Sequence, residues 1–390
     1  MRKEFGSAPA SPDADKEKEM YVAALLQEAR SSMALITRSL LASGFGDIQD
    51  DELLVFLALT MTDKKSAGSL LRTLGVSDQA VGSATGMLLS RGYLESGEDA
   101  DEPEQPSSAL TGHGDKALTV IADELKAQRW ANFPFRQGDI VICAPPRSGT
   151  TWTQMICALL IFQTPTLPAP LPKLSPWMET EDPHATRDNL FAQLATQEHR
   201  RFMKSHLSLD QMAIDSRVTY IAVARHPMDM MLSRYQISHA NEDEDRQKDK
   251  NSQPALREWL LRCIDDEGFA ILMRTLSAAW AGRDEPNVVL LRYEDMVADL
   301  EGQMRNLAAR LDITVSENTW PGLVRAATFE QMRAVADRIQ PAPNLKDPAK
   351  FFWRGKTRSG RALLTDHDLA LYNERAAQLA PADLLAWLNR

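Results

Sequence analysis

The stretch from Asp139 to Trp152 constrains the fold of this 390-residue chain more than any other. It reads Asp-Ile-Val-Ile-Cys-Ala-Pro-Pro-Arg-Ser-Gly-Thr-Thr-Trp: an apolar run, a turn rich in proline and glycine, and the start of a helix-length segment. An apolar run without polar alternation is typical of a strand buried on both faces. The pattern therefore predicts a strand, a tight turn and a helix in a parallel α/β sheet.

The turn itself is suited to an anion. The N–H groups at a helix N-terminus lack intrahelical partners, and the helix dipole favours negative charge there. Gly149 allows close approach of the backbone, Thr150 and Thr151 add hydroxyl donors, and Arg147 adds a fixed positive charge. The common triphosphate loop is Gly-x-x-x-x-Gly-Lys-Ser/Thr. Ala144 replaces its first glycine and Thr150 its lysine, so the sequence disfavours a nucleotide kinase.

Further segments add cations and a base. Lys204 and His206 lie two positions apart at the end of an apolar run, so an extended chain puts both side chains on one face. Arg225 ends another apolar run and Ser233 follows two turns into the next helix, a pair suited to a second anionic group. The stretch Arg354-Gly355-Lys356 gives a basic cluster beside glycine in an irregular segment.

The rest of the second half alternates apolar runs with helix-length segments, which predicts a parallel sheet flanked by helices. Strands are expected at Asp139–Ala144, Phe202–Lys204, Tyr220–Val223 and Val288–Leu291. Irregular segments are expected at 163–176, which holds five prolines, at 239–254 and at 341–350.

The first part of the chain predicts a small helical domain. Helices are expected at Tyr21–Leu41, Asp51–Met61, Ser66–Leu74, Val81–Ser90 and Asp115–Arg129, with a hairpin between the last two. Asp50 and Asp51 occupy expected N-cap positions, Gly75 an expected C-cap, and Ser77 can cap the next helix. The first 20 residues are expected to be a disordered tail.

This order of helices and hairpin over residues 21–130 resembles the winged-helix domain of MarR-type transcription factors. DNA binding is disfavoured, because a recognition helix needs Lys and Arg, and Ser77–Leu89 has neither. The expected wing carries six carboxylates, at Glu95, Glu98, Asp99, Asp101, Glu102 and Glu104. We expect the domain to serve dimerisation or docking, including a homodimer through this domain.

Five segments in the second half, taken in order, resemble the cytosolic-type sulfotransferases, which use 3′-phosphoadenosine 5′-phosphosulfate as donor. The family's Pro-Lys-Ser-Gly-Thr-Thr-Trp appears here with Arg147 for lysine, and its Lys-Thr-His-Leu-Pro appears as Lys204-Ser-His206-Leu-Ser. Its Arg with a Ser eight residues on, its Tyr-Glu-Asp-Met and its Ser-Phe-Lys-Glu-Met match the segments at Arg225, Tyr293 and Thr328. The resemblance implies a sulfotransferase domain over 131–390 with a P-loop-type sheet.

The resemblance also implies roles for single residues. His206 is the expected general base, with Lys204 and Arg147 neutralising the transferring group. For Tyr293 two interpretations stay open: a hydrogen bond to the nucleotide, or packing under the strand before it. The residues expected to bind the donor are Arg147, Ser148, Gly149, Thr150, Thr151, Trp152, Arg225, Ser233, Tyr293, Phe329, Arg354 and Gly355. The family's C-terminal dimer signature is degraded after Thr365.

Charge and cysteine content narrow the function classes. The net charge of −10 is concentrated in residues 1–130, which carry 13 basic and 21 acidic residues, so the second half is nearly balanced. Three scattered cysteines and no apolar leader predict a cytoplasmic protein without a membrane span or a metal site. We expect a sulfotransferase acting on a hydroxyl, or less readily an amine, of a small organic or lipid-like acceptor. The alternative is a transcriptional regulator with a nucleotide-sensing half.

Overall fold

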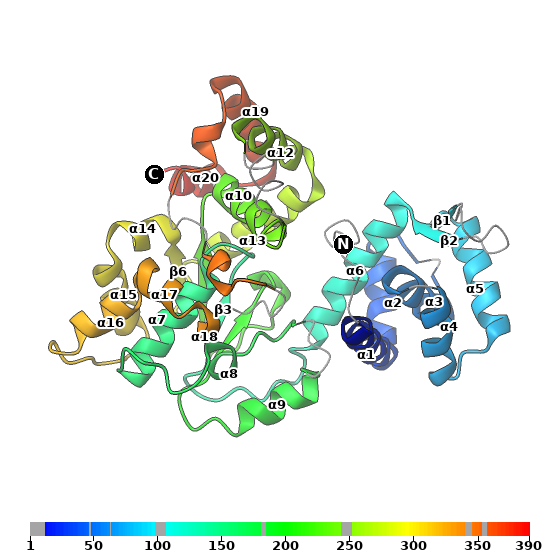
Figure 1. The fold of residues 1–390 in the computed structure, drawn as a ribbon, viewed down its shortest axis with the longest axis horizontal. Helices are drawn as coiled ribbons and strands as arrows, with labels where there is room; N and C mark the ends of the chain where they lie inside the picture. Colours follow the sequence, from blue (N-terminus) through cyan, green and yellow to red (C-terminus); the bar gives the residue numbers. More distant parts are fainter. Residues whose placement is uncertain are drawn as a thin grey trace. The chain divides into compact units, whose positions relative to one another are not determined.

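The computed structural model describes residues 12–46, 48–62, 64–97, 107–180, 185–242, 252–339, 345–352 and 357–390. The chain divides into two compact units (Figure 1). The N-terminal unit comprises Met1–Phe133 together with Glu179–Gln193, and the sheet unit comprises Pro134–Met178 and Leu194–Arg390. Among the described residues, no helix is long and apolar enough to cross a bilayer.

The N-terminal unit is mainly helical. Its elements are α1 (Pro12–Ser31), α2 (Met33–Ala42), α3 (Asp50–Met61), α4 (Lys64–Thr73), α5 (Asp78–Ser90), β1 (Leu94–Gly97), β2 (Ser107–Leu110) and α6 (Gly112–Gln128). The strands β1 and β2 pair antiparallel, as the expected hairpin requires. The order of elements agrees with the prediction, and the winged-helix identity stays a prediction.

Three expectations for this unit were wrong in detail. The helix expected at Tyr21–Leu41 is broken at Ser32, where two consecutive serines favour local hydrogen bonds over helix. The helix α1 begins at Pro12, so residues 12–20 are not a disordered tail, and residues 1–11 lie outside the described residues. Gln49, rather than Asp50 or Asp51, is the N-cap of α3.

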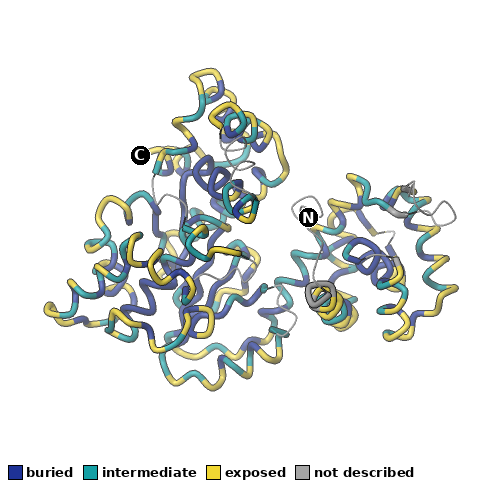
Figure 2. Tube along the Cα trace, viewed as in Figure 1, coloured by how far each residue is buried: buried dark blue, intermediate teal, exposed yellow. Residues whose placement is uncertain are grey.

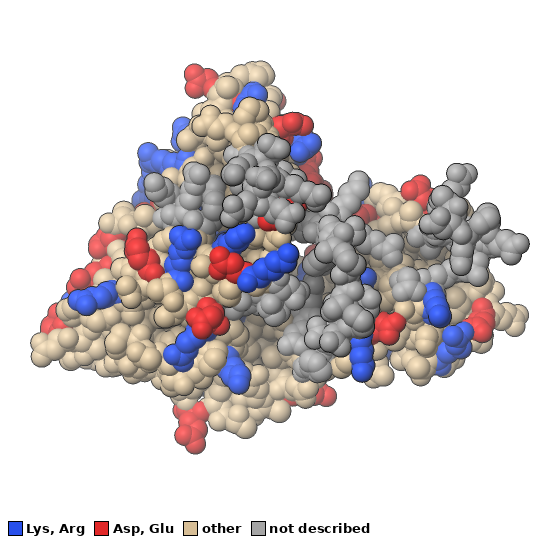
Figure 3. All heavy atoms as spheres, in the orientation of Figure 1, with Lys and Arg blue, Asp and Glu red and all other residues tan. Residues whose placement is uncertain are grey.

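The core of the N-terminal unit forms around α3. Every residue from Glu52 to Thr60 is buried, which agrees with a sequence that is apolar all round the helix (Figure 2). Gly75 adopts a φ of +78°, as a C-cap glycine does, and the Ser77 hydroxyl accepts a hydrogen bond from the Ala80 amide at the start of α5. On the visible face of this unit, basic and acidic side chains are interspersed (Figure 3).

The sheet unit is built on four parallel strands in the order β4-β3-β5-β6. They are β3 (Ile140–Cys143), β4 (Phe202–Ser205), β5 (Thr219–Ala224) and β6 (Val288–Arg292). Each strand begins and ends within one residue of its expected bounds. The strands β3 and β4 are buried along their whole length. The predicted parallel sheet with buried strands is confirmed.

Helices pack around this sheet in two groups (Figure 1). One apolar cluster joins the strands to α7 (Thr150–Phe162), α8 (Leu171–Leu174), α14 (Tyr293–Ala298), α15 (Leu300–Arg310), α16 (Trp320–Ala326), α17 (Phe329–Ala334) and α18 (Ala336–Ile339). A second joins α10 (Pro227–Ser238), α12 (Gln253–Asp265), α13 (Glu267–Ala281), α19 (Asp366–Leu379) and α20 (Ala382–Leu388). The short helix α8 corrects the expectation that 163–176 is wholly irregular, because Pro170 and Pro172 lie where a helix start tolerates proline.

The remaining described elements are short or join the two units. They are α9 (Arg187–Ala195), η2 (Leu209–Gln211), η3 (Pro348–Phe351) and η4 (Arg361–Leu363). Of the other two segments expected to be irregular, residues 243–251 and 341–344 lie outside the described residues.

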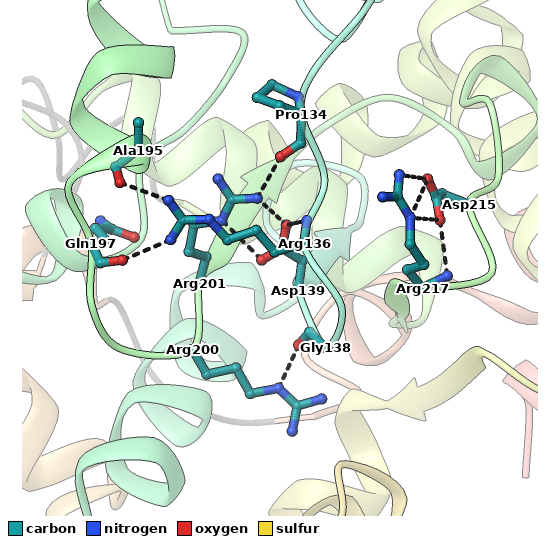
Figure 4. Close-up of polar contacts among 10 residues, drawn as sticks. All are labelled: Pro134, Arg136, Gly138, Asp139, Ala195, Gln197, Arg200, Arg201, Asp215 and Arg217. Carbon is teal, nitrogen blue, oxygen red and sulfur yellow. Dashed lines mark hydrogen bonds and ion pairs between the residues drawn. The ribbon is translucent and has the colours of Figure 1, made fainter.

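Arginines hold the amino ends of the strands together (Figure 4). Arg201, directly before β4, forms a buried two-point ion pair with Asp139, directly before β3, and also donates to the Pro134 carbonyl at 2.8 Å. Arg136 donates to the carbonyls of Ala195 and Gln197 at 2.7 and 2.9 Å. These bonds fix the entry of the chain into the sheet and leave the carboxyl ends for the site.

Candidate functional site

The carboxyl ends of β3 and β5 meet at the point where the strand order reverses. The chain leaves β3 toward β4 on one side and continues through β5 and β6 on the other. In open α/β sheets, ligands bind in the crevice at such a switch point. The turn at Arg147 follows β3 and Arg225 follows β5, so the topology brings the predicted anion-binding segments together.

The backbone of the turn between β3 and α7 adopts an uncommon conformation. Arg147 and Gly149 have φ angles of +69° and +112°, a left-handed region that non-glycine residues rarely adopt. A Cβ on Gly149 would lie 2.9 Å from Cδ2 of Tyr293, so glycine is required there. Gly149 is the N-cap of α7 and supplies no side-chain cap, which leaves the first N–H groups of the helix for a ligand.

The hydroxyls of this turn differ in their engagement. Ser148 is fully buried and its hydroxyl donates to the Pro145 carbonyl at 2.7 Å, so it holds the turn itself. Thr151 is buried in the first turn of α7. The Thr150 hydroxyl is buried and finds no hydrogen-bond partner among the described residues. A buried hydroxyl without a partner is costly, so Thr150 is the hydroxyl of this turn best suited to a bound ligand.

Arg147 lies beside Ser233 and Phe351. Its Nε donates to the Ser233 hydroxyl at 3.0 Å, one terminal nitrogen donates to the Phe351 carbonyl at 2.9 Å, and its guanidinium lies 4.4 Å from the centre of the Phe351 ring. The sequence assigned Arg147 and Ser233 to two separate anionic groups, whereas the structure joins them. Burial, followed by the nearby charge of Arg225, lowers the pKa of Arg147 to about 10, so it stays cationic at neutral pH.

Tyr293 packs between the two predicted donor segments. The Arg225 guanidinium lies 4.1 Å from the centre of its ring and donates to the Arg147 carbonyl at 3.2 Å. The Trp152 ring meets Tyr293 edge to face at 5.3 Å, and the Trp152 indole donates to the Ala327 carbonyl at 2.8 Å. Burial raises the pKa of Tyr293, so the phenol stays neutral. Of the two interpretations left open for Tyr293, these contacts favour packing.

Lys204 and His206 share one face of the chain at the end of β4, as predicted. Both contact Trp177: the Lys204 ammonium lies 4.3 Å from the centre of the indole, and the His206 ring meets it edge to face at 5.1 Å. The Nδ1 atom of His206 lies 2.6 Å from the Ala144 carbonyl in the phosphate turn. The sheet register explains this contact, because Cys143 and Ser205, the residues just before this pair, face each other.

Of the remaining predicted residues, the structure describes Phe329 but not Arg354 or Gly355. Phe329 begins α17, two residues beyond the Ala327 carbonyl that Trp152 contacts, and its ring lies 6.2 Å from the Phe352 ring. Arg354 and Gly355 lie outside the described residues.

Several polar residues near the site have structural partners. His226 is the N-cap of α10 and accepts from the Met228 amide, and burial lowers its pKa. His239 is the C-cap of the same helix. Glu294 accepts from the His226 amide at 3.0 Å, and burial raises its pKa. In the part of the chain that the structure describes, no cluster of His, Cys, Asp or Glu is arranged to hold a metal ion.

Sequence reasoning missed Asp229. Its buried carboxylate accepts from the Arg358 and Gly360 amides at 2.7 Å each, and thereby ties the chain beyond residue 356 to α10. A Cβ on Gly360 would lie 2.5 Å from the Met228 carbonyl, which shows how closely that chain packs on the helix. No local sequence signal links residues so far apart.

Comparisons with known proteins agree with this geometry. Residues 137–376 match the family described as the sulfotransferase domain. A glycolipid sulfotransferase of Mycobacterium bovis is 35% identical over 313 residues, which cover 70% of this chain and 93% of that protein. A luciferin sulfotransferase of Photinus pyralis is 29% identical and covers 52% of this chain and 58% of its own length. A solved mouse sulfotransferase complexed with PAP superposes with a TM-score of 0.51 at 19% identity, over 68% of this chain and 92% of that one, which supports the fold.

Proposed function

This chain belongs to the sulfotransferase family and is a sulfotransferase, and from this premise we propose that it transfers a sulfonate group from 3′-phosphoadenosine 5′-phosphosulfate to a hydroxyl of a glycolipid. The observation that carries the proposal is the bond between His206 and the carbonyl of Ala144, because it joins the candidate base to the phosphate turn.

The donor is supported by the cations at the switch point. Arg147 and Arg225 are both buried or half-buried next to α7, and Ser233 and the Thr150 hydroxyl lie with them. Charge-assisted hydrogen bonds to phosphate from such groups are about twice as strong as neutral ones. We assign Arg147, Ser233 and Arg225 to the 3′-phosphate and the backbone of the turn with Thr150 to the 5′-phosphosulfate.

The tautomer of His206 suits a general base. A carbonyl oxygen accepts only, so in the neutral ring Nδ1 carries the proton and Nε2 carries the lone pair. In our proposal Nε2 takes the hydroxyl proton of the acceptor as its oxygen forms a bond to sulfur. The bond between sulfur and the 5′-phosphate oxygen breaks in line, and the bisphosphate leaves with that electron pair. Lys204 stabilises the charge that develops between them.

A glycolipid acceptor is supported by two observations. Two mycobacterial relatives that are 34–35% identical are named glycolipid sulfotransferases, and each matches over 93% of its own length. The Trp177 indole meets the His206 ring at 5.1 Å, so a large aromatic side chain lies beside the proposed base. Sugar rings and acyl chains both pack on an aromatic face, whereas a highly charged polysaccharide would need a basic groove.

The proposal is tested by incubating the full chain with a radiolabelled donor and a panel of acceptors. The panel contains neutral glycolipids, lipids without a sugar, simple phenols and primary amines. We expect label in the glycolipid, together with an equal amount of the 3′,5′-bisphosphate. Transfer to a phenol but not to any glycolipid would overturn the acceptor, and absence of bisphosphate with all acceptors would overturn the donor.

A further inference from the structure

Within the sheet unit, the residues Pro176–Met178 form a short extra strand beside β4. Trp177 makes a parallel bridge with Lys204. The Lys204 amide donates to the Pro176 carbonyl at 2.9 Å, and the Met178 amide donates to the Lys204 carbonyl at 3.1 Å. Residues that lie opposite each other in paired strands put their side chains on one face of the sheet, as do alternate residues of one strand. The Trp177 side chain therefore shares a face with Lys204 and His206.

The Trp177 indole packs against a buried ammonium group. Lys204 is only 4% exposed, and its Nζ lies 4.3 Å from the centre of the indole. The ring quadrupole of an aromatic side chain attracts a cation, most strongly for tryptophan and where water is excluded. Lysine has a long and flexible stem, so its charge stays in one place only when a partner holds it there. The indole is such a partner, and it also meets the His206 ring edge to face.

A buried glutamine holds the chain directly before this strand. Gln154, in the second turn of α7, donates from its side-chain nitrogen to the carbonyl and to the hydroxyl of Ser175, at 2.9 Å each. Both residues are buried, and a buried amide or carbonyl that loses its partner destabilises the fold. The Ser175 amide donates to the Leu171 carbonyl, which ends α8. Because Pro176 and Trp177 follow Ser175 directly, the bonds from α7 fix where the extra strand begins.

We propose that Trp177 is a positioning residue for the transfer: its indole holds the Lys204 ammonium where charge develops, and Gln154 with Ser175 holds the strand that carries the indole. Trp177 acts through Lys204 and takes no proton itself. The inference rests on the proposed function, because that function assigns the developing charge to Lys204.

A double-mutant cycle of Trp177→Leu and Lys204→Met tests this route of action. Trp177 is half-buried, so its replacement leaves the core of the unit intact. We expect Trp177→Leu to lower kcat about tenfold or more, while the Kd for the 3′,5′-bisphosphate stays within about twofold. In the Lys204→Met chain the same replacement lowers kcat by less than about twofold, because the ammonium that the indole holds is absent. Trp177→Phe keeps an aromatic face and retains most of the kcat.

The cycle separates this role from that of an acceptor wall. An indole that only packs against the acceptor would change the acceptor KM and leave kcat nearly unchanged in Trp177→Leu. It would also reduce turnover by the same factor with and without the Lys204 ammonium. Either result would refute the positioning role.

Nuclear magnetic resonance of the chain with isotope-labelled lysine gives a readout that does not depend on turnover. The ring current of the indole shifts the side-chain methylene signals of Lys204 upfield, and the spectrum of Lys204→Met identifies these signals. We expect them to move to the positions of exposed lysines in Trp177→Leu and to move less in Trp177→Phe. Signals that keep their positions in Trp177→Leu would show that the indole does not hold the ammonium.

Hydrogen exchange tests the support from α7. Gln154→Met keeps the length of the side chain and removes its amide. The matched control is Gln163→Met at the C-terminal end of the same helix, where the exposed amide donates to the Thr314 carbonyl at 2.9 Å. We expect the Met178 and Lys204 amides to exchange faster in Gln154→Met only, and equal exchange in both variants would contradict the support. A wild-type chain that transfers no sulfonate contradicts the proposed function instead, and the lysine spectra and exchange rates then still decide the two contacts.

Discussion

A single hydroxyl illustrates how the site is prepared for a ligand. Thr150 is buried at the start of α7 without a hydrogen-bond partner among the described residues, while Ser148 in the same turn is satisfied. Unsatisfied buried groups destabilise a fold, and they persist where a ligand provides the missing partner. The turn thus appears in the structure as two hydroxyls with different tasks, which the spacing in the sequence does not distinguish.

Replacing Thr150 by Val keeps the shape and removes the hydroxyl. We expect the Kd for the 3′,5′-bisphosphate to rise about tenfold or more, because a hydrogen bond to a charged group contributes about 1.5–3 kcal/mol. The thermal stability of the ligand-free chain stays unchanged or rises, since no bond is lost. The matched control is Thr153→Val on the same helix, whose hydroxyl donates to the Gly149 carbonyl at 3.2 Å. Equal losses of affinity in calorimetric titrations of both variants would contradict the assignment.

At the residue scale, local chemistry was predictable and long-range partners were not. The alternation of an extended chain put Lys204 and His206 on one face, and both contact Trp177. The partner of Arg147 could not be predicted, because Ser233 is 86 residues away and the bond depends on how β3 and β5 pair. The positive φ of Arg147 likewise has no signature in the sequence.

At the scale of elements, apolar runs predicted the four strands because burial on both faces leaves little choice of residue. Helix boundaries were harder. The break at Ser32 lies within a continuous helical pattern, and the start of α1 at Pro12 falls in a stretch of high charge. Both boundaries are set by local detail that a hydrophobic pattern does not report, and helix ends are the least certain part of such a prediction.

The ion pair at the amino ends of β3 and β4 should stabilise the sheet unit strongly. Arg201→Met leaves the Asp139 carboxylate buried without its guanidinium, and we expect a loss of about 3–5 kcal/mol in the free energy of unfolding. The matched control is Arg217→Met. Arg217 is half exposed and pairs with Asp215, so solvent screens the pair and this change should cost much less than Arg201→Met. Urea denaturation of both variants measures the difference, and equal losses would refute it.

The docking of α19 on α12 should depend on pH. Hydrogen bonds from Arg257 hold the pKa of Asp368 well below its usual range. A folded-state pKa below the unfolded value stabilises the fold above about pH 4 and loses that contribution on acidification. Asp368→Asn should therefore lower the Tm most at neutral pH, with the difference from wild type shrinking toward pH 3. A constant difference in calorimetry from pH 7 to pH 3 would speak against this role.

At the scale of the whole molecule, the helical pattern of the first part and the alternating apolar runs of the second half predicted two units. The sequence did not indicate that one segment of the second half packs with the first. The segment Glu179–Gln193 lies in the second half of the sequence and packs with the first. Its contacts are made by Trp130, Arg129 and Phe133, which come from a different part of the chain. Apolar patterns in the sequence indicate which residues are buried. Only the folded structure shows which of the two cores those residues join.

The uneven distribution of charge along the chain also bears on which ligands the whole molecule can bind. The acidity of residues 1–130 disfavours DNA as a ligand, and α5 carries neither Lys nor Arg. In the sheet unit, the cations Arg147 and Arg225 lie where β3 and β5 end. A homodimer through the N-terminal unit stays a prediction.

The central claim is that His206 takes the proton while other groups hold the donor. It is tested most directly by measuring turnover and 3′,5′-bisphosphate affinity side by side for the wild type and His206→Asn, which keeps a polar side chain of similar size. We predict that kcat falls by at least about 100-fold, as for the loss of a general base, while the Kd for the bisphosphate stays within about twofold. A kcat of His206→Asn close to that of the wild type would contradict the claim. A loss of bisphosphate affinity that parallels the loss of kcat would also contradict it.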